Sequence, residues 1–311
     1  MGKEAPRPLT AMGIIRKGAN LFWRSAKPML SILVIILVLN YVCLSRTSSI
    51  VDSSISHFLR RKNLLRRLEN GTDAFNSIVN ESWDEIRQII RAVVVVSLTY
   101  YLLYSFIVIA IIYTVAMVGK SRTVALKDLV VRIRRTWMGT MATNIYVYFL
   151  TSGYLSFCVL LMSAVAFFGG ISAATLALIA AMAILGFLFF LHLSMLWSQA
   201  VVVSVMEEGR SGIFALGRAA ERVQGMKGSG FRVNFLLFLV VALAQTLIST
   251  ATFFPLPDLL SSIIFSLVYL LVMVLIQAVN VVFYYECQEN QEEAATRMEN
   301  LAYTRAPLEE P

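Results

Sequence analysis

Residues 173–204 read AATLALIAAMAILGFLFFLHLSMLWSQAVVVS and contain no Asp, Glu, Lys or Arg. A helix needs roughly 20 apolar residues, within a range of about 17–25, to cross the hydrocarbon core of a bilayer. This run is long enough to cross the membrane with a tilt or to extend past the headgroups. It therefore predicts a membrane-spanning helix.

Five more apolar runs lie at residues 29–44, 92–118, 144–168, 235–254 and 259–285. The first is the shortest, but it follows a basic segment and contains the uncharged sequence ILVIILVL. The whole chain is 58% hydrophobic and 15% charged, with a mean hydropathy of +0.72, whereas soluble domains average about 45–50% apolar and 25% charged residues. This composition excludes a disordered chain, a basic nucleic-acid-binding domain and most water-soluble enzymes. We predict an all-α, polytopic membrane protein with six transmembrane helices.

The distribution of Lys and Arg predicts the orientation, because cytosolic loops are enriched in these residues. Six lie in residues 1–28, six in 119–143, five in 205–234 and two in 286–311, against eight in 45–91. We therefore expect a cytosolic basic amphipathic segment (1–28), a membrane domain (29–285) and an acidic cytosolic tail (286–311). Both termini would be cytosolic, in the endoplasmic reticulum, the Golgi or the plasma membrane.

The predicted outer loop, residues 45–91, contains two glycosylation sequons, at Asn70 and Asn80. Sequons are used only on the luminal or outer side, so these two residues are candidate glycosylation sites, and whether they are used is left open. Apolar residues at helical spacing predict two helical arms in this loop, with a bend at 70–71. A helical outer loop of this kind is also a candidate surface for a protein partner.

Taken in order, the six predicted spans form three helical hairpins of two spans each. A basic segment with apolar residues at helical spacing precedes each hairpin. The apolar stripes of these segments are Met12, Ile15, Ala19 and Phe22, then Leu126, Val130, Ile133 and Trp137, then Ile213, Leu216, Ala220 and Val223. Beside them lie the candidate contacts to anionic lipid headgroups: Arg16, Lys17, Arg132, Arg134, Arg135, Arg218 and Arg222. Helices of this kind lie in the headgroup layer with their cations on anionic lipid. The segments are either copies of an ancient repeat or independent basic cytosolic loops.

Two stretches resemble a family of plant polytopic membrane proteins of unknown function. The first is VVSVMEE at 202–208, followed by GIFAL at 212–216 and a basic helix; the second is VFYYEC at 282–287. More distantly, the chain is similar to the membrane domain that bacteria attach to glycerophosphodiester phosphodiesterases, where an acidic residue ends a long span. Glu207 or Glu208 occupies that place here. The resemblance covers roughly residues 92–290 and implies six spans, but no phosphodiesterase activity, because the catalytic domain is not part of this sequence.

We expect no enzyme activity, no cofactor and no metal site. The predicted spans contain no ionisable Asp, Glu, Lys or Arg, which argues against an ion-coupled transporter. No nucleophile–base motif, HExxH or phosphate-binding loop is present. Glu207 and Glu208 are the nearest approach to a site, and their simplest interpretation is a solvated pair at a helix end.

Two functions therefore remain as hypotheses. The first is a structural or adaptor protein of the secretory pathway that interacts with lipid through its basic helices, with the acidic tail or the outer loop as surfaces for protein partners. The second is a channel or carrier for an uncharged or lipid-like substrate. Cys287, predicted at the headgroup boundary, is either a palmitoylation site or a plain free thiol. Residues 288–303 would continue the last span as a solvated helix.

Overall fold

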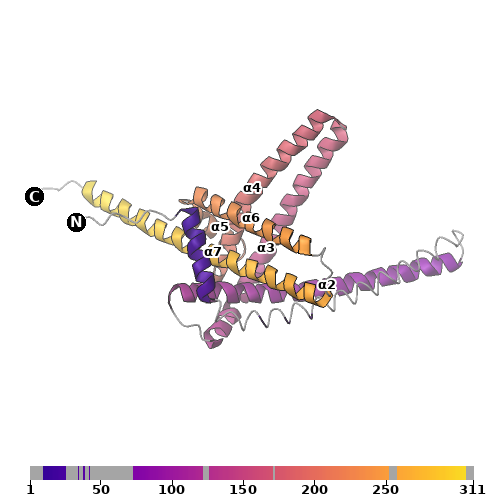
Figure 1. Ribbon diagram of the computed structural model, residues 1–311, viewed down its shortest axis with the longest axis horizontal. Helices are drawn as coiled ribbons and strands as arrows, with labels where there is room; N and C mark the ends of the chain where they lie inside the picture. Colours follow the sequence, from indigo (N-terminus) through magenta and orange to yellow (C-terminus); the bar gives the residue numbers. More distant parts are fainter. Residues whose placement is uncertain are drawn as a thin grey trace, which may run out of the picture.

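The computed structural model describes residues 10–25, 34, 38, 42, 73–121, 126–170, 172–251 and 258–305. All regular secondary structure in these residues is helical (Figure 1), which confirms the all-α prediction. A helix at residues 11–25 comes first in the chain. The labelled helices that follow are α2 (Asp73–Gly119), α3 (Leu126–Gly169), α4 (Ala173–Met206), α5 (Ile213–Val223), α6 (Lys227–Ala251) and α7 (Asp258–Arg305).

Within the described residues, five helical stretches are long and apolar enough to cross a membrane. They are Val93–Gly119, Lys127–Gly169, Ala173–Met206, Lys227–Thr250 and Ile263–Arg297. Each overlaps one of the predicted spans. The remaining predicted span, 29–44, lies outside the described residues except for positions 34, 38 and 42, which are helical.

Several predicted boundaries between loop and span are not breaks in the helix. One arm of the outer loop and the span after it form the single helix α2, because residues 73–118 contain neither Gly nor Pro. The basic segment at 126–143 continues into the next span as α3, in which three glycines but no proline occur. Likewise, α7 extends through the tail to Arg305, as the sequence predicts for residues 288–303. The predicted bend at 70–71 lies outside the described residues, as do residues 255–257 between the last two predicted spans.

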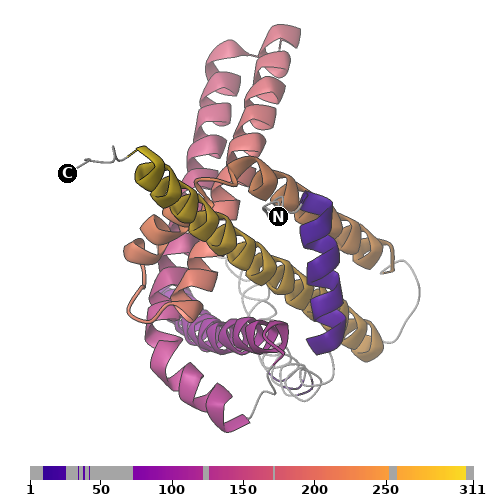
Figure 2. The ribbon, with the colours of Figure 1, turned by 90° about the vertical axis from the view of Figure 1, so that its left-hand side faces the viewer.

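Helices α3 and α4 form an antiparallel arm that projects from the other helices (Figures 1 and 2). The turn between them is short because Gly170 adopts a φ of +63°. Ser172 caps α4 by accepting a hydrogen bond from the Thr175 amide at 3.1 Å, and the Thr175 hydroxyl donates to the Gly169 carbonyl at 3.0 Å. Farther down the arm, the Tyr154 hydroxyl donates to the Gly186 carbonyl at 2.6 Å.

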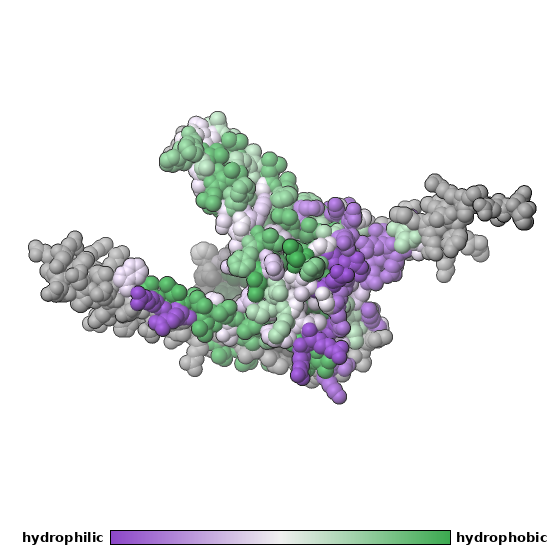
Figure 3. All heavy atoms as spheres, turned by 180° about the vertical axis from the view of Figure 1, so that it is seen from behind, coloured by the Kyte–Doolittle hydropathy of each residue, from purple (hydrophilic) through white to green (hydrophobic). Residues whose placement is uncertain are grey.

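The surface of this arm is hydrophobic, whereas hydrophilic residues gather away from it, mainly on the right of the view in Figure 3. Phe167 and Phe168 at its tip are 83% and 85% exposed. Large exposed apolar patches on a protein surface mark contact with a membrane or a partner. Lipid contact is the simplest explanation for a surface carried by two membrane-length helices.

The core lies where the other helices meet the base of the arm. One buried cluster joins α2, α4, α5 and α7, and a second joins the helix at 11–25 to α4, α5, α6 and α7. Small residues allow the closest approaches: a Cβ on Gly18 would lie 2.6 Å from Cγ2 of Val279 in α7. Buried polar bonds also join helices, as between the Asn234 amide of α6 and the Leu191 carbonyl of α4 at 2.7 Å. Both features are typical of helix packing in membranes.

The buried faces of the three basic segments differ from the predicted apolar stripes. In the helix at 11–25 the buried residues are Ala11, Ile14, Gly18 and Ser25; in the first part of α3 they are Leu129, Thr136, Thr140 and Thr143; in α5 they are Ala215, Ala219 and Val223. Three members of the predicted stripes are 62–70% exposed: Met12, Val130 and Ile213. The predicted stripes thus lie largely outside the protein core, and their contact with the headgroup layer stays a prediction.

Candidate functional site

The end of α4 and the turn that follows it carry the most connected polar cluster in the described part of the chain. Glu207 is the C-cap of α4, and its backbone amide donates to the Val203 carbonyl at 2.8 Å. Gly209 and Gly212 adopt φ values of +78° and +58°, a region that favours glycine. This turn brings α5 back alongside the end of α4.

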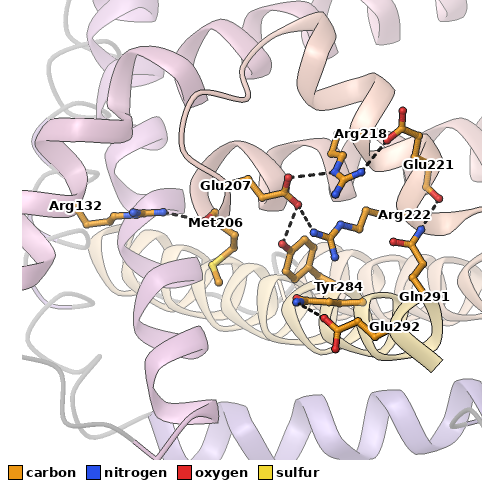
Figure 4. Close-up of polar contacts among 10 residues, drawn as sticks. Arg132, Met206, Glu207, Arg218, Glu221, Arg222, Tyr284, Gln291 and Glu292 are labelled. Carbon is orange, nitrogen blue, oxygen red and sulfur yellow. Dashed lines mark hydrogen bonds and ion pairs between the residues drawn. The ribbon is translucent and has the colours of Figure 1, made fainter. Parts of the chain in front are cut away.

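The Glu207 carboxylate receives three hydrogen bonds from two other helices (Figure 4). Arg222 of α5 donates to Oε1 at 2.7 Å, and the Tyr284 hydroxyl of α7 donates to the same oxygen at 3.0 Å. The Arg218 Nε of α5 donates to Oε2 at 3.3 Å. The Arg222 guanidinium also lies 5.1 Å from the centre of the Tyr284 ring, within the range of a cation–π contact.

This cluster is largely shielded from solvent. The side chains of Glu207 and Arg222 are 19% and 12% exposed. Arg218 also binds Glu221, one turn away in α5, at 2.9 Å. The hydrogen bond to Glu221 is the main cause that raises the pKa of Arg218, and the negative charge of Glu207 adds to it against the opposing effect of partial burial. Two guanidinium groups thus balance the charge of the carboxylate, and its three hydrogen bonds join α4 to α5 and α7.

Arg132 of α3 binds the last carbonyls of α4. Its guanidinium donates to the carbonyls of Val205 at 2.7 Å and of Met206 at 3.0 Å, and to the Glu208 carboxylate at 2.7 Å. The last carbonyls of a helix lack partners within the helix and carry a partial negative charge. Arg132 therefore satisfies the end of α4 and joins it to α3. Beside it, a pocket of about 330 Å³ separates α3 from the turn at 207–211.

The seven candidate lipid-binding cations divide into two groups. Arg132, Arg218 and Arg222 are committed to contacts inside the protein, and the Lys17 ammonium binds Glu286 of α7 at 2.6 Å. Arg16, Arg134 and Arg135 are exposed. Arg135 comes no closer to a described carboxylate than 3.9 Å, at Glu208. Lys17 is exposed as well, with its side chain 56% accessible, but its ammonium is paired with Glu286.

The remaining candidate residues have different environments. Cys287 is only 1% exposed, in the cluster that includes Ala11 and Ile14. The helix at 11–25 is one of the elements that form this cluster, and palmitoylation of the thiol stays a prediction. Asn80 lies in the first part of α2, and Asn70 lies outside the described residues.

The solvated-pair interpretation of Glu207 and Glu208 fits only the second of them. Glu208 is 62% exposed, whereas Glu207 is mostly buried. Sequence reasoning missed Tyr284 and Glu286, which bind Glu207 and Lys17. Their signal was present in the stretch at 282–287, where two tyrosines and a glutamate follow an apolar run. Among the described residues, no group of His, Cys, Asp and Glu side chains has the arrangement of a metal site.

Comparison with known proteins gives one match. The model of a family described as "Domain of unknown function (DUF8558)" matches residues 2–302. Searches of the curated proteins and of the solved structures found no match to this chain. Because the family match covers nearly the whole length, the protein belongs to the DUF8558 family.

Proposed function

We propose that the protein is a structural membrane protein of the secretory pathway that interacts with anionic lipid through the cytosolic ends of its helices. The observation that carries this proposal is a repeated outward face of large apolar residues with a cation between them. On the helix at 11–25 this face holds Met12, Arg16 and Trp23, and the first part of α3 presents Val130, Arg134 and Met138 in the same way.

The physical basis is the boundary between acyl chains and headgroups. Met12 and Trp23 are 70% and 74% exposed, and burial of such side chains in lipid is favourable. The cations beside them reach anionic headgroups, each contributing about 1 kcal/mol near the surface. Ile213 and Phe214, at the start of α5, add a third exposed apolar pair. These segments thus suit a position in the headgroup layer.

The test uses the full chain in detergent micelles supplemented with either phosphatidylserine or phosphatidylcholine. We expect phosphatidylserine to raise the melting temperature more, and Arg16→Gln with Arg134→Gln to remove most of the difference. Arg91→Gln, an exposed cation far along α2, is the matched control and should leave it unchanged. The difference should also shrink as salt is added, because screening weakens exposed charge interactions. Equal stabilisation by both lipids would overturn the proposal.

A second candidate is a carrier for an uncharged, lipid-like substrate. A pocket of about 220 Å³ lies between α2, α6 and α7 and is lined by apolar residues together with Gln245, Tyr269 and Gln277. The side-chain oxygen of Gln277 is buried and accepts no hydrogen bond from any described group. A ligand hydroxyl would satisfy it. A photoreactive diacylglycerol should label this region in reconstituted protein, less so in Gln277→Leu and equally in Gln291→Leu. Labelling no stronger than by photoreactive phosphatidylcholine would remove this candidate.

A further inference from the structure

The helix at 11–25 crosses α7 close to the end of α2 (Figure 2). A pocket of about 300 Å³ is lined by residues of these three segments. Lys17, Asn20 and Arg24 line it from the first helix, Lys120 from the end of α2, and Tyr285 from α7. These groups come from three segments that are distant in sequence. The pocket is separate from the Glu207 cluster, with which it shares none of these residues.

The charges around this pocket do not balance. Three of its lining side chains are cations, and Lys17 alone has a carboxylate partner, Glu286. Arg24 and Lys120 make no ion pair with a carboxylate in the described part of the chain. The Lys120 ammonium lies 5.4 Å from the centre of the Tyr285 ring, a cation–π contact that holds it beside the pocket. Two positive charges are therefore left for an anion.

Tyr285, which lines the pocket, carries a hydroxyl that lacks a partner among the described residues. The Tyr285 hydroxyl is buried and makes no hydrogen bond with any described group. Buried hydroxyls normally have a partner, since leaving one unsatisfied costs roughly 1–3 kcal/mol. Because this hydroxyl is itself closed off from solvent, the ligand is inferred from the charge imbalance, which points to an anion.

We propose that this pocket binds a phosphate monoester, carried on the headgroup of an anionic lipid such as phosphatidic acid. A phosphate monoester carries a charge of about −1.5 to −2 at neutral pH, which matches the two uncompensated cations, whereas a phosphodiester carries one. The neighbouring Trp23 is 74% exposed, as expected of an aromatic side chain at the depth of the headgroups. The site rests on the proposed function and gives it a specific ligand.

The experiment measures lipid binding to the full chain in nanodiscs of neutral phosphatidylcholine, with phosphatidic acid or phosphatidylserine added. We expect binding of phosphatidic acid at least about tenfold tighter than of phosphatidylserine, and stronger as the pH rises through about 6, where the second phosphate proton is lost. Lys120→Gln should remove this preference and Lys120→Arg should retain it. Arg16 lies on the helix at 11–25 but does not line the pocket. Arg16→Gln should therefore lower the binding of both lipids without changing their ratio.

The outcomes separate this inference from the proposed function. Equal binding of the two anionic lipids, with both tighter than phosphatidylcholine, would overturn the pocket while leaving the general lipid interaction intact. No preference for either anionic lipid would overturn both. Displacement of phosphatidic acid by millimolar inorganic phosphate would assign the site to a soluble phosphate and overturn its assignment to a lipid headgroup. An unchanged melting temperature of Lys120→Gln in neutral nanodiscs shows that a lost preference is not a loss of fold.

Discussion

Glu207 and Glu208 are adjacent in sequence, yet they have opposite environments. Glu207 points towards α5 and α7 and receives donors from Arg222, Arg218 and Tyr284. Glu208 points towards α3 and stays mostly exposed. The sequence identified the pair as the place where a long span ends. It did not reveal that Glu207 leaves the helix with an extended backbone (φ −102°, ψ 117°), in which neighbouring side chains point to opposite sides.

We expect Glu207→Gln to lower the free energy of unfolding by about 2–3 kcal/mol, because it leaves the largely buried Arg222 without its countercharge. Glu208→Gln is the matched control and should cost less than about 1 kcal/mol, since exposed ion pairs contribute little. Thermal unfolding of both variants in the same detergent measures the difference. Similar losses for the two would show that Glu207 does not join the three helices.

The limits of one span were predicted closely, whereas α2, α3 and α7 run past the predicted span boundaries. Hydrophobic runs fix the length of a membrane-crossing helix, so α4 begins where the apolar run begins and ends two residues beyond it. The three basic segments face inward by small residues such as Ala11 and Gly18, and by Thr136 and Thr140 in α3. Small residues let helices approach closely in membranes, while large apolar residues are free to contact lipid. A stripe chosen by size therefore marks the outer side.

Gly18 tests this account of how the helix at 11–25 docks on α7. We expect Gly18→Leu to displace this helix, because any Cβ there would collide with Val279. The buried Cys287 would then become accessible. In a chain whose only cysteine is Cys287, a water-soluble maleimide should react at least about tenfold faster after the substitution.

The control for this displacement is Gly217→Leu in α5, where a Cβ would meet nothing within 4 Å. It should leave the reaction rate of Cys287 unchanged. Fast labelling of Cys287 without any substitution would mean that the first helix does not cover it, and would favour palmitoylation as a use of this thiol.

At the scale of the whole molecule, long-range contacts bring together the segments that the charge distribution places on one side of the membrane. Lys17 pairs with Glu286, 269 positions away, and Lys120 lies over Tyr285. Arg132 joins α3 to the end of α4. Composition identified apolar runs, five of which overlap membrane-length helices in the described residues. The pairings could not be read in this way, because nothing local in the sequence specifies which helix ends meet.

We expect α4, which is long and apolar enough to span a membrane, to cross it between the tip of the arm and the Glu207 cluster. Because Tyr284 of α7 binds Glu207, the tip of the arm and the tail after Glu286 should then lie on opposite sides of the membrane. In a chain without its native cysteines, Glu289→Cys in sealed microsomes should react with a membrane-impermeant maleimide from the cytosolic side. Phe168→Cys, at another exposed position near the tip of the arm, should react only after permeabilisation. The reverse pattern would invert the orientation. Labelling of both in sealed microsomes would mean that the arm lies along the membrane surface and does not cross it.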